Sequence, residues 1–172
     1  MKVLTIFRHA KAERPEAYPQ DFDRPLTNRG RKDAERIGAI VAGLTPAVDC
    51  IISSTAVRAA QTTSHLVAVL DFAGAPLWAE NAYLATAETL LELLREAPTD
   101  AGHVVLVGHN PGMEELAALL CTGATNGAML RLPTAGIAHL LLDIGRWQQI
   151  RAAGAELQLL VTPKYMPQRM GA

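Results

Sequence analysis

Short apolar runs rich in β-branched residues alternate with longer segments of helical periodicity along most of this 172-residue chain. The strand-like runs are expected at residues 3–7, 49–53, 76–79, 103–108, 136–143 and 155–161. Strands that alternate with helices build a sheet with helices packed on both faces. The sequence therefore predicts an α/β fold, a three-layer α/β/α sandwich around a mostly parallel central sheet.

Polar residues with N-capping preference precede three of the helical segments. Thr27 or Asn28 is expected to begin the first helix, Ser54-Thr55 the second and Thr86 the third, which ends at Glu96. Helical spacing then assigns an inward face to each of the first two helices. These faces are Ala34, Ile37, Val41 and Leu44 in the first, and Val57, Ala60, Val67 and Leu70 in the second.

Composition narrows the class of protein. A mass of 18.4 kDa, 49% apolar residues and a net charge of −1 predict one globular domain over residues 1–172. No uncharged stretch reaches the roughly 18 residues of a membrane span, and the N-terminus lacks a signal-peptide pattern, so a cytoplasmic protein is expected. Cys50 and Cys121 lie far apart on apolar segments, which favours buried thiols over a disulfide or zinc site.

Basic residues are concentrated near the N-terminus. Residues 1–36 contain nine Lys and Arg against six Asp and Glu, whereas the remainder contains seven against eleven. This excess is small and mixed with acids, and aromatic residues make up only 5% of the chain, so nucleic-acid binding is not expected. An anionic small group or an acidic protein surface remains open as a partner.

Three predicted strand ends carry the residues with catalytic chemistry. The first strand ends in Arg8-His9, the second leads to Arg58 at a helix start, and the fourth ends in Gly108-His109. Parallel strands bring their carboxyl ends to one edge of the sheet. Two imidazoles and two guanidiniums at that edge suit a tetrahedral oxyanion, because Arg forks match phosphate oxygens and helix N-termini favour anions.

Each of these features alone has a simpler explanation as a cap, a turn or a surface charge. Only their joint placement at three strand ends favours a site. The other histidines, His65, His103 and His139, are expected to be packing or surface residues. In the loop that follows the first strand, Asp21 and Asp23 either flank the pocket or are solvated, and Arg24 is either a pocket residue or the partner in a loop ion pair. The second alternative is favoured in each case.

Four segments in this order resemble the signatures of the histidine phosphatase superfamily, and most closely its compact SixA-type branch of phosphohistidine phosphatases. The resemblance runs from about residue 2 to residue 162. It implies the phosphoglycerate mutase-like fold. The matching segments are Arg8-His9-Ala10, Arg24-Pro25-Leu26-Thr27 with Gly30, residues 53–62, and Val107-Gly108-His109-Asn110-Pro111.

The resemblance implies that His9 is the nucleophile, which forms a phosphohistidine intermediate. Arg8, Arg58 and His109 would bind the phosphoryl oxygens. No cofactor is implied, and the sequence has neither a Walker lysine nor carboxylates spaced for magnesium. We therefore expect catalysis without a metal.

Two departures from the family pattern concern the substrate. Ala10 stands where the family usually has Gly, which implies either a slightly more crowded approach to the phosphate or a tolerated methyl group. Members that act on phosphomonoesters have an acidic residue that protonates the leaving oxygen, and Glu80 is the nearest match, although an exposed loop charge explains it equally well. A phosphorylated imidazole leaves as neutral imidazole and needs no such acid, which favours phosphohistidine in a protein as the substrate.

Several other functions stay open at this stage. The first is a small-molecule phosphomonoesterase or mutase of the same superfamily, and the second is a non-catalytic phosphate-binding module. A nucleotide-binding Rossmann protein is disfavoured because no Gly-x-Gly-x-x-Gly follows the first strand. The sequence identifies neither the partner protein nor the oligomeric state.

Overall fold

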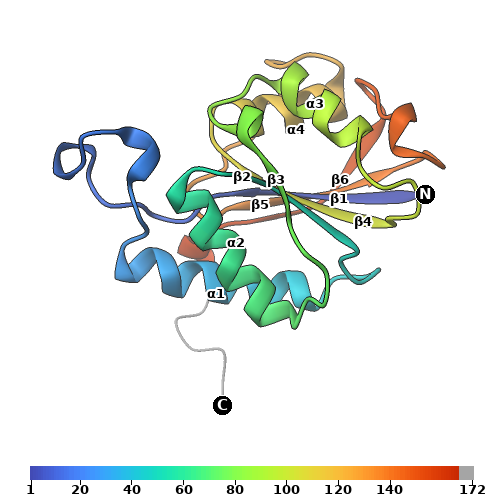
Figure 1. Ribbon diagram of the computed structural model, residues 1–172. Helices are drawn as coiled ribbons and strands as arrows, with labels where there is room; N and C mark the ends of the chain where they lie inside the picture. Colours follow the sequence, from blue (N-terminus) through green and yellow to red (C-terminus); the bar gives the residue numbers. More distant parts are fainter. Residues whose placement is uncertain (167–172) are drawn as a thin grey trace.

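A six-stranded sheet forms the middle layer of the molecule, seen edge-on in Figure 1. The computed structural model describes residues 1–166. The strand order is β3-β2-β4-β1-β5-β6, in which β1 to β4 run parallel and β5 runs antiparallel to both of its neighbours. The strands are β1 (Lys2–Arg8), β2 (Cys50–Ser54), β3 (Leu77–Ala79), β4 (His103–Gly108), β5 (Ile137–Leu142) and β6 (Ala155–Val161).

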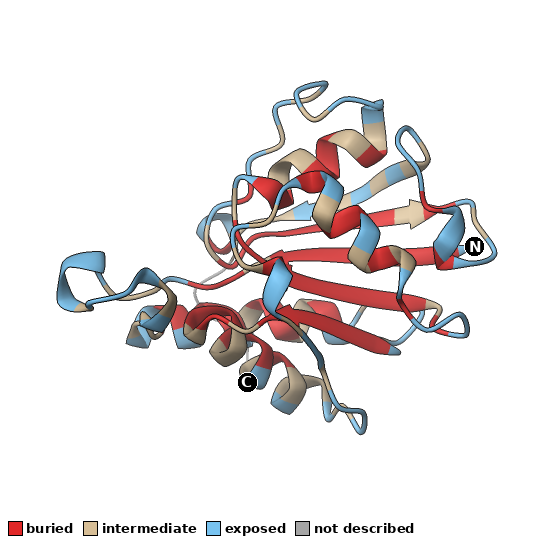
Figure 2. Cartoon of the chain, turned by 45° about the horizontal axis from the view of Figure 1, so that its top comes forward, coloured by how far each residue is buried: buried red, intermediate tan, exposed pale blue. Residues whose placement is uncertain are grey.

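Two helices cover each face of this sheet, which confirms the predicted three-layer α/β/α architecture (Figure 1). The helices are α1 (Asn28–Ala42), α2 (Val57–Leu70), α3 (Ala87–Arg95) and α4 (Gly112–Thr122). Helices α1 and α2 lie on one face, and α3 and α4 lie on the other. The four central strands β2, β4, β1 and β5 are almost entirely buried, whereas the edge strands β3 and β6 are partly exposed (Figure 2).

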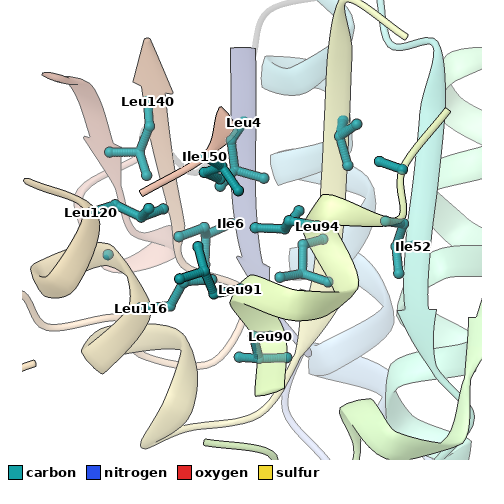
Figure 3. Close-up of a cluster of buried hydrophobic side chains, with 14 of the residues drawn as sticks. Leu4, Ile6, Ile52, Leu90, Leu91, Leu94, Leu116, Leu120, Leu140 and Ile150 are labelled. Atoms are coloured by element: carbon teal, nitrogen blue, oxygen red, sulfur yellow. The ribbon is translucent and has the colours of Figure 1, made fainter. Parts of the chain in front are cut away.

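Each face of the sheet has its own hydrophobic core. Leu4 and Ile6 of β1 point toward α3 and α4, where they meet Leu90, Leu94 and Leu116 (Figure 3). Phe7 lies in the opposite core with Ile37 of α1 and Leu66 of α2. Because successive side chains of a strand alternate between faces, β1 contributes to both cores. Its C-terminal end is thereby held rigidly at the sheet edge.

The predicted caps are confirmed for α1 and α3 but not for α2. Thr27 accepts a hydrogen bond from the Gly30 amide, and Thr86 accepts one from the Thr89 amide. Helix α2 begins instead after Ala56, without a side-chain cap. The Ser54 hydroxyl is directed to His109, at a distance of 2.9 Å.

The inward face of α2 was also wrongly predicted. Its buried residues are Arg58, Ala59, Thr62, Thr63 and Leu66, whereas Val57, Ala60, Val67 and Leu70 are only partly buried. Hydrogen bonds inside the fold explain the difference, since polar side chains on this face bond toward β1 and β2 and rotate the helix accordingly. In α1 the prediction is confirmed apart from Leu44, which lies beyond the helix end.

The long loop after β1 projects from the sheet edge, as the blue segment in Figure 1. It contains two short 3-10 turns, Pro15–Ala17 and Asp21–Asp23. Its two ends are tied together by a bridge between Ala12 and Leu26 and by the hydrogen bond from the Thr27 amide to the Lys11 carbonyl. Gly30 packs so tightly against the Lys11 backbone that a Cβ atom there would collide with it, which explains glycine at this position.

A chain of hydrogen bonds joins Thr5, His103 and His139 inside the fold. His103 Nδ1 lies 2.8 Å from the Pro46 carbonyl oxygen, which only accepts, so this nitrogen carries the proton. His103 Nε2 must then accept from the Thr5 hydroxyl, and the Thr5 oxygen accepts from His139 Nδ1, each at 2.8 Å. His103 and His139 therefore serve packing, as predicted. His65, on α2, lies 3.1 Å from Glu35.

Both cysteines are free thiols, as predicted; Cys50 is buried, and Cys121 is partly buried against the core on the same face of the sheet. Within residues 1–166, no helix has the length and apolar character needed to cross a membrane.

Substitution of Thr5 by Val tests the hydrogen-bond chain. The change keeps the side-chain shape but leaves His103 Nε2 and His139 Nδ1 without their partner in a buried position. We expect a loss of about 1–3 kcal/mol in the free energy of unfolding, measured by urea denaturation. Thr5→Ser keeps the hydroxyl and is the control. A Thr5→Val protein as stable as the wild type would contradict the assignment.

Candidate active site

One cavity of about 480 Å³ brings together all four residues predicted at the strand ends. Arg8 and His9 come from the end of β1, Arg58 from the first turn of α2, and His109 from the segment that joins β4 to α4. The other residues that line this pocket are Lys11, Ala12, Asp21, Arg24, Leu84, Asn110 and Thr134. The convergence expected from parallel strand topology is present.

The imidazole of His9 is held in one tautomer by the backbone. Its Nδ1 lies 2.8 Å from the carbonyl oxygen of Ala10, and a carbonyl oxygen only accepts hydrogen bonds. Nδ1 therefore carries the proton, and Nε2 has a free lone pair. Arg58 Nε donates to that lone pair across 3.3 Å, which places the unprotonated nitrogen beside a cation.

The surroundings of His9 keep this ring neutral. Burial lowers the pKa of His9 to about 3, and the positive charges of Arg58, Arg8 and Arg24 act in the same direction, against the hydrogen bond to Ala10. Burial also lowers the pKa of His109 to about 3, with further contributions from His9 and Arg58. Both rings are therefore neutral at physiological pH, and a neutral imidazole is nucleophilic.

Arg58 is almost completely buried, and its outer edge is anchored by Asp21. Arg58 Nη1 donates to the Asp21 carbonyl oxygen across 2.6 Å, and Nη2 donates to the Asp21 carboxylate across 2.8 Å. Its Nε faces His9. A buried guanidinium without a partner is strongly disfavoured. Asp21 therefore stabilises the position of Arg58, and the Nε of Arg58 remains directed toward His9.

Asp21 also binds two other side chains. The Tyr83 hydroxyl donates to its carboxylate across 2.7 Å, and Arg24 donates across 2.5 Å. Burial raises the pKa of this carboxyl, but the hydrogen bonds from Tyr83 and Arg24 and the charge of Arg58 outweigh it and hold the pKa well below its usual range. Asp21 is therefore ionised at any physiological pH.

Ser54 orients the second imidazole. The Ser54 oxygen accepts from the Ala56 amide and lies 2.9 Å from His109 Nε2, the one acceptor within reach of the Ser54 hydrogen among the described residues. Donation by Ser54 to Nε2 satisfies the buried hydroxyl and leaves the proton of His109 on Nδ1. That Nδ1 is buried and has no hydrogen-bond partner within residues 1–166. It is thus available as a donor to a ligand.

Arg8 completes the cluster from the other side. Its Nη1 donates to the Leu132 carbonyl across 2.8 Å, whereas its buried Nε has no hydrogen-bond partner in the described part of the chain. The rings of His9 and His109 lie 5.0 Å apart between centroids. Among the described residues, the pocket thus combines an unprotonated imidazole nitrogen with two unpaired N–H donors, Arg8 Nε and His109 Nδ1, an arrangement suited to a phosphoryl group.

The structure adds to the predictions for three residues. Asp21 is an exposed loop residue, as expected, but its carboxylate also binds Arg58 and it lines the pocket; Arg24 forms the expected ion pair with Asp21 and lines the pocket as well. Glu80 is exposed and is not among the residues that line the pocket, since the chain turns away after β3. The segment reaches the site instead through Tyr83, whose ring packs edge-on against His109.

Ala10 does not crowd the pocket. Its side chain is fully buried in the core shared with α1 and α2, and its amide donates to Thr62 across 3.0 Å. The methyl group is accommodated by packing. No group of three or more His, Cys, Asp and Glu side chains within residues 1–166 is arranged to hold a metal ion.

Comparisons with known proteins agree with this arrangement. Residues 4–83 match the family model of the histidine phosphatase superfamily (branch 1). An uncharacterized protein of Mycobacterium leprae is 32% identical over 91% of this chain and 99% of its own length. The fold and these matches define the class: the chain belongs to the histidine phosphatase superfamily. Membership implies a hydrolase that acts on phosphoryl groups.

Two solved structures place the chain more narrowly. A structure from Nakamurella multipartitia, assigned as phosphohistidine phosphatase SixA, has a TM-score of 0.81 and 30% identity, covering 94% of this chain and 96% of its own. A second from Agrobacterium tumefaciens, with the same assignment, has a TM-score of 0.75 and 33% identity, covering 94% and 98%. The chain is of the SixA type.

The two site histidines are expected to stay neutral across the ordinary pH range. Since burial lowers the pKa of both His9 and His109 to about 3, their ring C–H resonances should not titrate between pH 8 and pH 5. NMR spectra of the wild type, assigned with His9→Ala and His109→Ala, measure this. A midpoint near the unperturbed value of about 6.5 for either ring would contradict the account.

Proposed function

We propose that this protein is a phosphatase that removes the phosphoryl group from phosphohistidine in another protein, with His9 as nucleophile. The observation that carries the proposal is the unprotonated Nε2 of His9, which accepts a 3.3 Å hydrogen bond from the buried Arg58 guanidinium. A binding module has no need of a nucleophilic nitrogen there, because another cation would serve it better.

In the first step, His9 Nε2 attacks phosphorus while the bond between phosphorus and the substrate nitrogen breaks. The substrate imidazole keeps the proton on its other nitrogen and leaves as neutral imidazole. His9 retains its Nδ1 proton on the Ala10 carbonyl. In the second step, water attacks phosphorus, the bond to Nε2 breaks, and the water proton passes to the phosphate product and solvent.

Arg8, Arg58 and the Nδ1–H of His109 are proposed to hold the three phosphoryl oxygens during both steps. Phosphoryl transfer through a loose transition state depends mainly on positioning and on charge stabilisation. Fixed donors in a largely buried site supply both. A phosphorylated protein of unidentified sequence is the proposed partner.

The absence of an available proton donor favours phosphohistidine over a phosphate ester. An alkoxide leaving group needs a general acid. Asp21 is the one carboxyl among the lining residues within the described chain, and its lowered pKa keeps it ionised. His109 is not an available acid either, because burial lowers its pKa to about 3 and its ring is neutral. A substrate whose leaving group departs without being protonated by the enzyme fits this pocket best.

Loss of the nucleophile provides the first test. His9→Ala should lower turnover of a histidine-phosphorylated peptide by more than about a thousandfold and abolish transfer of labelled phosphate to the protein. The label is trapped by rapid denaturation without acid. His65→Ala, which alters a partly exposed histidine of α2, is the matched control and should be labelled like the wild type. Labelling of the His9→Ala protein would disprove the proposed intermediate.

Glu80 provides the second test. Because Glu80 lies outside the pocket lining, Glu80→Gln should change turnover of the phosphohistidine peptide by less than about twofold. Steady-state kinetics on this peptide and on a sugar phosphate separate the two substrate classes. A large loss on the peptide would contradict the acid-free mechanism. Faster turnover of the sugar phosphate by the wild type would favour a phosphomonoesterase.

A further inference from the structure

More than half of the Lys and Arg residues of this chain line the phosphoryl pocket and two neighbouring cavities. A second cavity shares Arg8 and Asn110 with the pocket, and a third shares Lys164 with the second. The shared residues show that the second cavity adjoins the phosphoryl pocket and that the third adjoins the second. We call the Lys and Arg residues that line the three cavities the basic face.

The basic face is much more positive than the chain as a whole. Nine of the sixteen Lys and Arg residues line the three cavities, but only three of the seventeen Asp and Glu residues do. The face therefore has a formal excess of six positive charges in a protein of net charge −1. Such an asymmetry attracts and orients an anionic partner.

The three carboxylates of this surface are already paired with its cations. Asp21 binds Arg58 and Arg24. Asp33 lies 3.5 Å from Arg29 and 3.2 Å from Arg36. Glu114 accepts from the Leu132 amide and lies 3.7 Å from Arg131. These ion pairs stabilise the local structure. The formal excess of six positive charges already includes these three carboxylates.

This charge extends beyond what one phosphoryl group requires. Arg29, Lys32 and Arg36 of α1 line the third cavity and are not among the residues of the phosphoryl pocket. Lys32 and Lys164 are exposed. A ligand that meets these cations while its phosphoryl group lies at His9 must be large and must bear several negative charges.

The middle of this surface favours a protein over a nucleic acid. Met129, Leu160 and Tyr165 line the second cavity with exposed fractions of 84%, 40% and 81%. Apolar side chains beside cations suit a protein surface, since protein interfaces combine an apolar centre with a polar rim. Acidic side chains on such a partner would complement the basic face.

We propose that the basic face docks an acidic surface that flanks the phosphohistidine of the protein substrate. This inference rests on the proposed function, because it places the phosphoryl group of the same partner at His9. The cations outside the pocket, Lys32 and Lys164 among them, raise the rate of productive encounter and select acidic partners.

Two histidine-phosphorylated peptides of equal length test the inference, one with four glutamates around the phosphohistidine and one with four glutamines. At low salt, the wild type should turn over the glutamate peptide with about tenfold higher kcat/KM. The difference should vanish in about 1 M NaCl, where charges are screened within about 3 Å. Equal kcat/KM for the two peptides at low salt would overturn the proposal.

Charge reversal locates the effect on the surface. Lys32→Glu/Lys164→Glu should lose the preference for glutamate and keep the wild-type kcat on the glutamine peptide. Arg146→Glu/Arg151→Glu makes the same charge change at exposed positions outside the three cavities and should keep the preference. The assignment of the glutamate preference to the basic face would be contradicted if this control lost the preference or if Lys32→Glu/Lys164→Glu kept it.

Binding distinguishes failure of this inference from failure of the proposed function. Fluorescence anisotropy measures the affinity of labelled, unphosphorylated peptides for the His9→Ala protein, independently of turnover. A preference for the glutamate peptide in this assay, together with no hydrolysis of either phosphorylated peptide by the wild type, would support the docking surface and disprove the phosphohistidine phosphatase. Equal affinities, or tighter binding of a DNA oligonucleotide than of the glutamate peptide, would overturn the docking proposal.

Discussion

The hydrogen bond from His9 Nδ1 to the Ala10 carbonyl oxygen is the constraint on which the rest of the site depends. It fixes the tautomer of a buried ring and leaves one lone pair, on Nε2, beside Arg58. The same residue, Ala10, is held by Thr62 of α2 and by the core between the sheet and α1. Packing of the fold thus determines which nitrogen is available for chemistry.

The second constraint is electrostatic and links the projecting loop to the pocket. Arg58 is 3% exposed, and a guanidinium in that position requires hydrogen-bonded partners. Asp21 supplies two of them from the loop, and Tyr83 holds Asp21 in turn. The ionised carboxylate therefore stabilises the cation that faces His9, and the pocket contains no carboxyl group able to donate a proton among the residues described. The preference proposed for phosphohistidine follows from this pairing.

Much of this arrangement could be predicted because it depends on local patterns. β-branched runs indicated the buried strands, Thr27 and Thr86 indicated helix starts, and parallel topology brought Arg8, His9, Arg58 and His109 together. The errors concern side chains whose partners are distant in sequence. Ser54 resembled a helix cap but bonds His109, 55 positions later, and Asp21 resembled a solvated loop residue but bonds Arg58, 37 positions later. The face of α2 was misjudged because apolar periodicity carries no information about buried Arg58 and Thr62. The one sequence signal for Asp21 was its position just before Arg24-Pro25-Leu26-Thr27.

The site of phosphorylation on His9 tests the central claim most directly. Phosphoprotein formed with excess substrate and trapped without acid would be examined by ³¹P and ¹⁵N NMR of the ring. The account predicts that phosphorus is bonded to Nε2, with the proton on Nδ1. Phosphorus bonded to Nδ1 would contradict it, because the Ala10 carbonyl would then not define the nucleophilic nitrogen.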